Sequence, residues 1–152
     1  MAARAKAGCG MRKWLNVLIV LVLALVVAAS AGAVGKRKKG SQLEAMQMAY
    51  ATAIRWGEFE DAWQLVDPAY REAHPMTELA FERYQQVQIS GYTDKNSSVD
   101  AEGNVIRNIE LRVINKHTMA ERTERYREQW RWDPASKRWW LAVGLPDLWQ
   151  GQ

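Results

Sequence analysis

One uninterrupted apolar run near the N-terminus limits what this chain can fold into more than any other feature. Residues 14–34 are 21 consecutive residues without a charge, and Asn16 is the one strongly polar side chain among them. As an α-helix rising about 1.5 Å per residue, the run would span roughly 30 Å, the thickness of a bilayer's hydrocarbon core. A buried helix of this length in a globular domain would need polar residues on its solvent face. The run therefore predicts a single transmembrane segment.

The same run is also compatible with a signal peptide that is cleaved. Small residues precede two cleavage positions, after Ala31 and Ala33, and a basic segment lies before the apolar run. Against cleavage stands the basic cluster of residues 36–39, which is typical of the flank of a retained span. We expect a retained signal-anchor, and the alternative is a protein secreted after cleavage near one of these two alanines.

This interpretation divides the chain into a basic tail (1–13), a transmembrane signal-anchor (14–34), a basic linker (35–40) and one domain (41–152). Eight basic residues flank the anchor, four on each side: Arg4, Lys6, Arg12, Lys13, Lys36, Arg37, Lys38 and Lys39. By the positive-inside rule the two orientations are almost equally favoured, because both sides of the anchor carry four basic residues. The positive α-amino group slightly favours a cytoplasmic N-terminus. We expect the domain on the extracytoplasmic side of the membrane.

The net charge of the chain is +4 and its pI is about 9.3, values that suggest nucleic-acid binding when taken alone. The charge is segregated, however. Eight of the 21 basic residues lie in residues 1–40, which contain no acidic residue, so residues 41–152 hold 13 basic against 17 acidic residues, a net charge of −4. The basicity belongs to the membrane flanks, where it meets anionic headgroups. We expect the membrane as a partner, and no nucleic acid.

The residues that most often carry chemistry are scattered. Cys9 is the single cysteine, which excludes an internal disulfide and a cysteine-based metal cluster. His74 and His117 fall in predicted loops, Asp100 in a predicted turn and Glu110 on the polar face of a predicted strand. Metal binding is not expected from two distant histidines, and a raised carboxylate pKa would require burial against this pattern. No catalytic, metal or cofactor site is expected, and whether the chain is an enzyme stays open.

Helical patterns occupy the first half of the domain. Ser41 and Glu44 form a capping box, Gly57 supplies a C-terminal stop, and Thr77 is placed to cap a later helix. Apolar residues with helical spacing line the first two segments: Leu43, Met46, Ala49, Tyr50, Ala53, Ile54, Phe59, Ala62, Trp63 and Val66. Three helices are predicted, over residues 41–57, 58–66 and 76–87.

After about Gln85 the apolar period changes to that of strands. A strand opens at Val87 and bends at Gly91, since glycine in a strand often marks a bulge. A second strand starts at Val105 with inward Ile109, Leu111 and Val113, and two more are predicted over residues 119–133 and 137–145. Turns are expected at 100–104, 115–118 and 133–136, and such short loops give an antiparallel sheet. The fold class is α+β: an N-terminal transmembrane helix, then three helices packed on a bent antiparallel sheet of about four strands.

The stretches "AYATAIRWGEFEDAWQLVDPAYR" (residues 49–71) and "YREQWRWDPASKRWWLAVG" (residues 126–144) carry a family resemblance. With the order of elements, they make the domain similar to the nuclear transport factor 2-like (cystatin-like α+β cone) superfamily. The resemblance implies a bent sheet wrapped around helices to form a cone with a pocket. Its enzymes, such as ketosteroid isomerases and polyketide cyclases, need an Asp or His inside the cone. No such constellation can be matched in this sequence.

Aromatic residues are the unusual feature of the domain. The candidate partner or ligand contacts are Trp56, Trp63, Tyr70, Tyr92, Tyr126, Trp130, Trp132, Trp139 and Trp140. Most of these rings are interpreted as core, but the adjacent Trp139 and Trp140 must lie on opposite faces of one strand, so one of them faces away from the core. We also expect the apolar Leu148 and Trp149 of the C-terminal tail to be packed against another surface, which the sequence does not identify.

The third predicted strand carries mixed charges on both faces. Tyr126, Trp130 and Trp132 share one face with Arg122, Glu124 and Glu128, whereas Arg125, Arg127, Arg131 and Glu121 occupy the other. Such a face is usually solvated, and alternating signs are also compatible with a homodimer formed through the sheet.

Two classes of function are compatible with these observations. The first is a membrane-anchored, non-catalytic binding or assembly domain, such as an accessory subunit of an envelope protein complex, with a protein partner or a second copy. The second is a pocket domain that binds or transforms a small apolar ligand. A deep cone lined by aromatic rings with one buried carboxylate would favour the second, and an interior filled by Trp56, Trp63 and Trp130 would exclude it.

Overall fold

The computed structural model describes residue 35 and residues 37–149. The predicted anchor, the basic tail and both candidate cleavage positions lie outside the described residues, as do Cys9, Arg12, Lys13 and Lys36. Within the described part of the chain, no helix is both long enough and apolar enough to cross a membrane. The chain divides into two compact units, Met1–Ser41 and Gln42–Gln152. The fold described below is that of the second unit.

The helical half of the domain contains one more helix than predicted. Residues 42–56 of this unit are helical, and three short helices follow: α2 (Phe59–Gln64), α3 (Pro68–Ala73) and α4 (Glu78–Tyr84). The sequence prediction lacked α3 because it ended the second helix at residue 66, directly before Asp67-Pro68. The pair instead begins one: Asp67 Oδ1 accepts a hydrogen bond of 3.0 Å from Ala69 N, and proline tolerates the first helical position.

Two other details of the helix prediction were wrong. Ser41 is not an N-cap, because residues 37–40 before it are already helical; lysine and arginine have good helix propensity, so the capping-box pattern did not mark a start. Ala49, assigned to the apolar stripe, is exposed. The stop at Gly57 is confirmed by its φ of 77°, and the cap at Thr77 by a bond of 3.2 Å from Ala80 N to its Oγ1.

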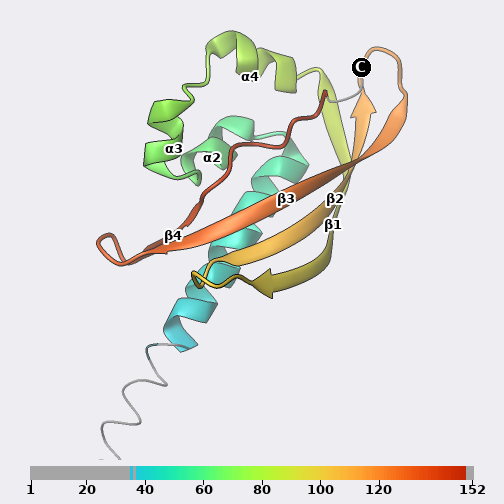
Figure 1. The fold of residues 1–152 in the computed structure, drawn as a ribbon. Coiled ribbons are helices and arrows are strands. Elements are labelled where there is room, and N and C mark those ends of the chain that lie inside the picture. The colour runs from blue at the N-terminus through green and yellow to red at the C-terminus, as the bar shows by residue number, and fades with distance from the viewer. Residues whose placement is uncertain (1–34, 36, 150–152) are drawn as a thin grey trace, which may run out of the picture. The chain divides into compact units, whose positions relative to one another are not determined.

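Four antiparallel strands form one sheet in the order β1-β2-β3-β4. They are β1 (Val87–Val99), β2 (Val105–Asn115), β3 (Glu121–Asp133) and β4 (Arg138–Leu141). Figure 1 shows three long, strongly twisted strands with α2, α3 and α4 together on one side. The three predicted turns are confirmed, and β1 has a register shift between Ile89 and Gly91, at the predicted bend. The fourth strand is shorter than predicted, because the chain leaves the sheet after Leu141.

The core lies between the helices and one face of the sheet. The helical side contributes Tyr50, Ile54, Phe59, Ala62, Trp63 and Val66, and the sheet contributes Ile109, Leu111, Val113, Trp130 and Leu141. The tail after β4 returns past the helices to the end of α4 (Figure 1), where the rings of Tyr84 and Trp149 lie 4.9 Å apart. Leu148 is completely buried there, as expected from the sequence. Helices on one sheet face make the architecture α+β.

Candidate functional site

A buried carboxylate lies at the centre of the inner sheet face. Glu128 is 0% exposed and sits on β3 between Tyr126 and Trp130, whose side chains point to the same face. Glu128 Oε2 accepts hydrogen bonds from Arg107 Nη1 at 3.0 Å and from Trp130 Nε1 at 2.8 Å. Its other oxygen, Oε1, accepts a hydrogen bond from the Tyr92 hydroxyl. Three donors from three strands therefore converge on one carboxylate.

Arg107 connects this carboxylate to the surface. Its guanidinium also donates through Nε to Asp94 Oδ2 at 2.8 Å, so the cation is shared between two acids. Exposure rises along the series, from 0% for the Glu128 side chain to 12% for Arg107 and 37% for Asp94. The polar network thus runs from the core to the partly exposed Asp94 on β1.

Burial controls the protonation behaviour of the network. Burial raises the pKa of Glu128 above the ordinary value of 4.5, and the hydrogen bonds from Tyr92, Trp130 and Arg107 oppose this effect without cancelling it. Burial and the neighbouring Glu128 raise the pKa of Tyr92, which keeps the phenol protonated as a donor. The pKa of Arg107 is raised as well: burial, the largest effect, would lower it, and the carboxylates of Glu128 and Asp94 together with Tyr92 outweigh it.

A second polar track adjoins the first. The hydroxyls of Tyr50 and Tyr126 are 3.1 Å apart, and the Tyr126 hydroxyl donates to Gly144 O at 2.7 Å. The Tyr50 ring also packs edge-on against Trp130, with ring centroids 5.9 Å apart. Together the hydrogen bonds of the two tracks join the helix over residues 42–56, the sheet and the C-terminal tail. The polar groups of both tracks bond to other groups of the chain, as in an internal structural network.

The structure separates the predicted aromatic contacts into three groups. Trp63, Trp130 and Trp139 are buried in the core, and Trp132 packs on Trp139 with ring centroids 5.5 Å apart. Tyr92 and Tyr126 belong to the polar tracks described above. Trp56 does not join Trp63 and Trp130 in the interior, the arrangement that would have excluded a ligand pocket, because it is 78% exposed.

The prediction that Trp139 and Trp140 face opposite sides is confirmed. Trp139 is directly paired with Trp132, and Trp140 with Arg131, in the antiparallel ladder of β3 and β4. Trp140 is half-buried on the outer side, where the Arg138 guanidinium lies 4.4 Å from its ring centroid. Trp140 Nε1 also donates to Ser136 Oγ at 3.3 Å.

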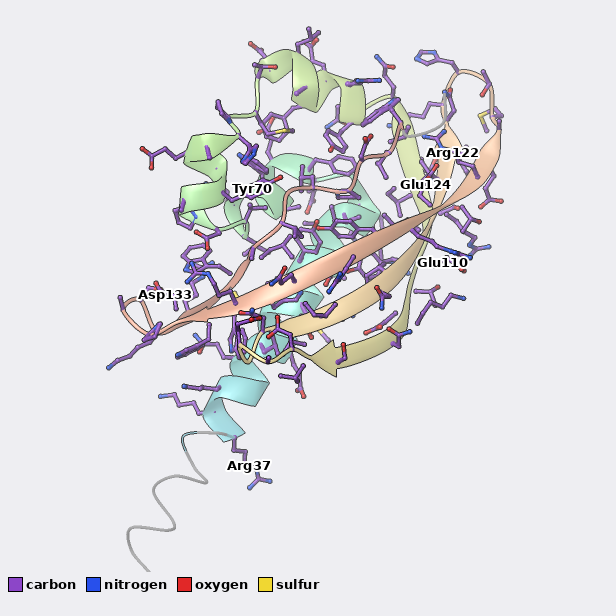
Figure 2. All side chains as sticks on the ribbon, viewed as in Figure 1. Arg37, Tyr70, Glu110, Arg122, Glu124 and Asp133 are labelled. Carbon is purple, nitrogen blue, oxygen red and sulfur yellow. The ribbon has the colours of Figure 1, made fainter. Side chains whose placement is uncertain are left out.

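The remaining predicted candidates do not converge. Tyr70 stacks on the exposed His74 with ring centroids 4.3 Å apart, and Figure 2 shows Tyr70 on the helical side of the sheet, away from Glu110. Glu110 pairs with Lys95 at 3.0 Å, and Asp100 accepts bonds within its own turn. His117 is exposed. Among residues 37–149, no group of three or more His, Cys, Asp or Glu side chains is placed to hold a metal ion.

Two of the open grooves formed by the described residues do not have Glu128 in their lining. The first, called the edge groove here, has a volume of about 600 Å³ and is lined by Thr52, Arg55, Trp56, Gly57, Gln85, Val87, Gln88, Ile89, Ser90 and Lys116. The second has a volume of about 390 Å³ and is lined by Lys95, Asn96, Asn108, Ile109, Glu110, Arg125, Tyr126 and Arg127. Glu128 lines neither of them, so the buried carboxylate and these openings are separate features.

Comparison of the chain with protein-family models, with curated proteins and with solved structures gives no match.

Proposed function

We propose that this chain is a membrane-anchored, non-catalytic binding or assembly domain, an accessory subunit of an envelope protein complex. The observation that carries this proposal is the state of Glu128: the best-buried carboxylate is 0% exposed and bonded to three donors of the chain itself. A general base must reach the proton that it removes from a substrate. A carboxylate enclosed in this way supports the fold, and binding is left to the surface.

The membrane part of the proposal rests on the uncharged run of residues 14–34 and on the basic residues at both of its ends. We propose a single retained span with the domain on the extracytoplasmic side, and secretion after cleavage near Ala31 or Ala33 is the alternative. The domain itself is proposed to be nuclear transport factor 2-like, on the order of its elements and the two stretches quoted above. Its partner is a protein of the complex or a second copy of the chain.

A pocket domain for a small apolar ligand is the second candidate. The observation that favours it is again Glu128, because a carboxylate with a raised pKa among aromatic rings resembles the acid or base of ketosteroid isomerase-like or polyketide cyclase-like enzymes. Trp63 and Trp130 already occupy the space where an apolar ligand would lie. This candidate therefore requires the interior to open.

Purification of the full-length protein from membranes in mild detergent tests the proposal. A companion protein present in stoichiometric amount, identified and then shown to rebind the purified chain, would support an assembly subunit. Recovery of the chain as a bare monomer would contradict that role. Native mass spectrometry of the same sample covers the second candidate: a small molecule that co-purifies with the wild type, but not with Glu128→Gln, would favour the pocket domain instead.

A further inference from the structure

The edge groove lies beside an unpaired strand edge. β1 is the first strand of the sheet and has β2 as its strand neighbour on one side, with no strand on the other side within the described residues. The groove is bounded by β1 residues 87–90 and by the last turn of the helix over residues 42–56. An exposed strand edge is a ready template for pairing with another extended chain.

The register shows which backbone groups face the groove. Gln86 O accepts a hydrogen bond from Lys116 N at 3.0 Å, and the next pairs along the ladder are Val87 with Asn115, Gln88 with Ile114 and Ile89 with Val113. Because hydrogen-bonded and non-hydrogen-bonded pairs alternate in an antiparallel ladder, the backbone groups of Val87 and Ile89 point away from β2. Both residues line the edge groove. Within the described residues these N–H and C=O groups have no backbone partner, and they lie at the floor of the groove, where Val87 and Ile89 are only 3% and 7% exposed.

Trp56 supplies an apolar anchor beside these groups. It is 78% exposed although it lies on the helix that carries the buried Ala53 and Ile54. The other large exposed apolar residues, Met48, Leu79, Val99 and Met119, do not line this groove. An exposed tryptophan at the rim of a groove is the residue type that most often dominates the energy of a protein interface.

The charge of the groove limits the chemistry of its occupant. Its lining contains two cationic side chains, Arg55 and Lys116, and no acidic side chain. Lys116 Nζ bonds to Gln85 O at 2.9 Å, which holds the ammonium group at the rim. An acidic side chain of the occupant would complement both cations. A second copy of the groove-lining part of β1 does not meet this requirement, because residues 87–93 contain no acidic residue, and Asp94, the acidic residue of β1, is paired with Arg107.

We propose that the edge groove binds an extended, acidic segment of a protein partner, which adds a strand to β1 and places an apolar side chain against Trp56. Strand addition of this kind takes affinity from backbone hydrogen bonds and specificity from alternate side chains. The inference rests on the proposed function and names the chemistry of its partner. A lipid headgroup could meet the two cations, but it has no backbone to pair with Val87 and Ile89.

The test uses the full-length protein in detergent and three short, blocked synthetic peptides. The first alternates glutamate with valine and phenylalanine, the second has lysine in place of glutamate, and the third is the first with N-methylated backbone at its centre. We expect the first peptide to bind at least about tenfold more tightly than the other two, because the second repels the cations and the third lacks strand donors. Bound peptide should also slow hydrogen exchange of the Val87 and Ile89 amides.

Two matched variants locate the site. Trp56→Ala should weaken binding of the first peptide at least about tenfold, whereas Leu79→Ala, which removes a similarly exposed apolar side chain outside the groove, should leave it unchanged. The double variant Arg55→Glu, Lys116→Glu should reverse the preference between the first two peptides. Equal binding of all three peptides, unchanged binding by Trp56→Ala, or no protection of the two amides would overturn the proposal.

Two other occupants would also overturn it. One is a second copy, detected as concentration-dependent dimerisation that Trp56→Ala abolishes. The other is a membrane surface, detected as binding to phosphatidylglycerol vesicles that Trp56→Ala abolishes while the peptides do not bind. The proposed function can fail independently of this proposal. A companion protein that co-purifies equally with wild type and Trp56→Ala would support the assembly role and contradict partner binding in the edge groove. A wild-type chain that purifies without any companion would contradict the assembly role.

Discussion

Arg107 and Glu128 are direct partners across β2 and β3, and their side chains meet with 3.0 Å between Arg107 Nη1 and Glu128 Oε2. The carboxylate is completely buried, and the guanidinium is 12% exposed. Removing one member of such a pair leaves the other charge in a low-dielectric interior without its partner. The domain is therefore expected to be sensitive to a single substitution in this pair.

Arg107→Met should lower the free energy of unfolding by about 3 kcal/mol, because it strands the buried carboxylate. The double variant Arg107→Met, Glu128→Leu should recover most of that loss, since it removes both charges. Urea denaturation followed by circular dichroism measures both values. Lys95→Met, which breaks the exposed pair with Glu110, is the control and should cost no more than about 0.5 kcal/mol. Equal losses for the two single variants would contradict the assigned role of Glu128.

The pH dependence of stability provides a second test of Glu128. Its folded-state pKa is raised above the unfolded value of 4.5, so the native state holds the proton more tightly than the unfolded state does. The stability that this group contributes is therefore fully present below the unfolded pKa. It falls as the pH rises from 4.5 to the folded pKa, and it does not change further above that pKa. We expect the free energy of unfolding of the wild type, relative to that of Glu128→Gln, to decrease as the pH rises through this range, as measured by urea unfolding at each pH. If the two free energies changed with pH in parallel, the pKa of Glu128 would not be raised.

The pairing of Arg107 with Glu128 was only partly within reach of the sequence. A ladder centred on the predicted turn at residues 115–118 would pair residue 107 with residue 126, whereas the observed loop extends to residue 120 and the observed ladder pairs residue 107 with residue 128. The period-2 pattern had correctly placed Glu128 on the face of Tyr126 and Trp130. The face of the carboxylate was therefore predictable, but its partner across the sheet depended on the exact length of the turn.

The edge groove was not predictable in the same way. Trp56 and Val87 are brought together by the packing of a helix end against the first strand, and no local pattern of apolar residues reports that contact. The strands and the turns were predictable because alternation and turn residues act locally. The extra helix α3 was missed where one local signal, Asp67-Pro68, is compatible with both an end and a beginning.

Capping of α4 is a local interaction that can be tested alone. Thr77→Ala should cost about 1 kcal/mol, because it removes the acceptor for Ala80 N at a helix of seven residues. Thr77→Ser keeps the hydroxyl and should cost a few tenths of that amount. Thermal unfolding of the two variants measures the difference. A loss for Thr77→Ser as large as that for Thr77→Ala would mean that the methyl group, and not the cap, carries the effect.

The last prediction compares a fully buried tryptophan of the domain with a largely exposed one. Trp130 is 0% exposed and donates to Glu128, whereas Trp56 is 78% exposed. Trp130→Ala should lower the free energy of unfolding by about 4 kcal/mol through the cavity that it leaves. Trp130→Phe keeps most of the ring but removes one donor from the buried carboxylate, so it should cost about 2 kcal/mol. Trp56→Ala should change stability by no more than about 0.5 kcal/mol, since it creates no cavity. If Trp56→Ala proved as destabilising as Trp130→Ala, Trp56 would have a structural role in the fold, and its exposure could not be attributed to a binding surface.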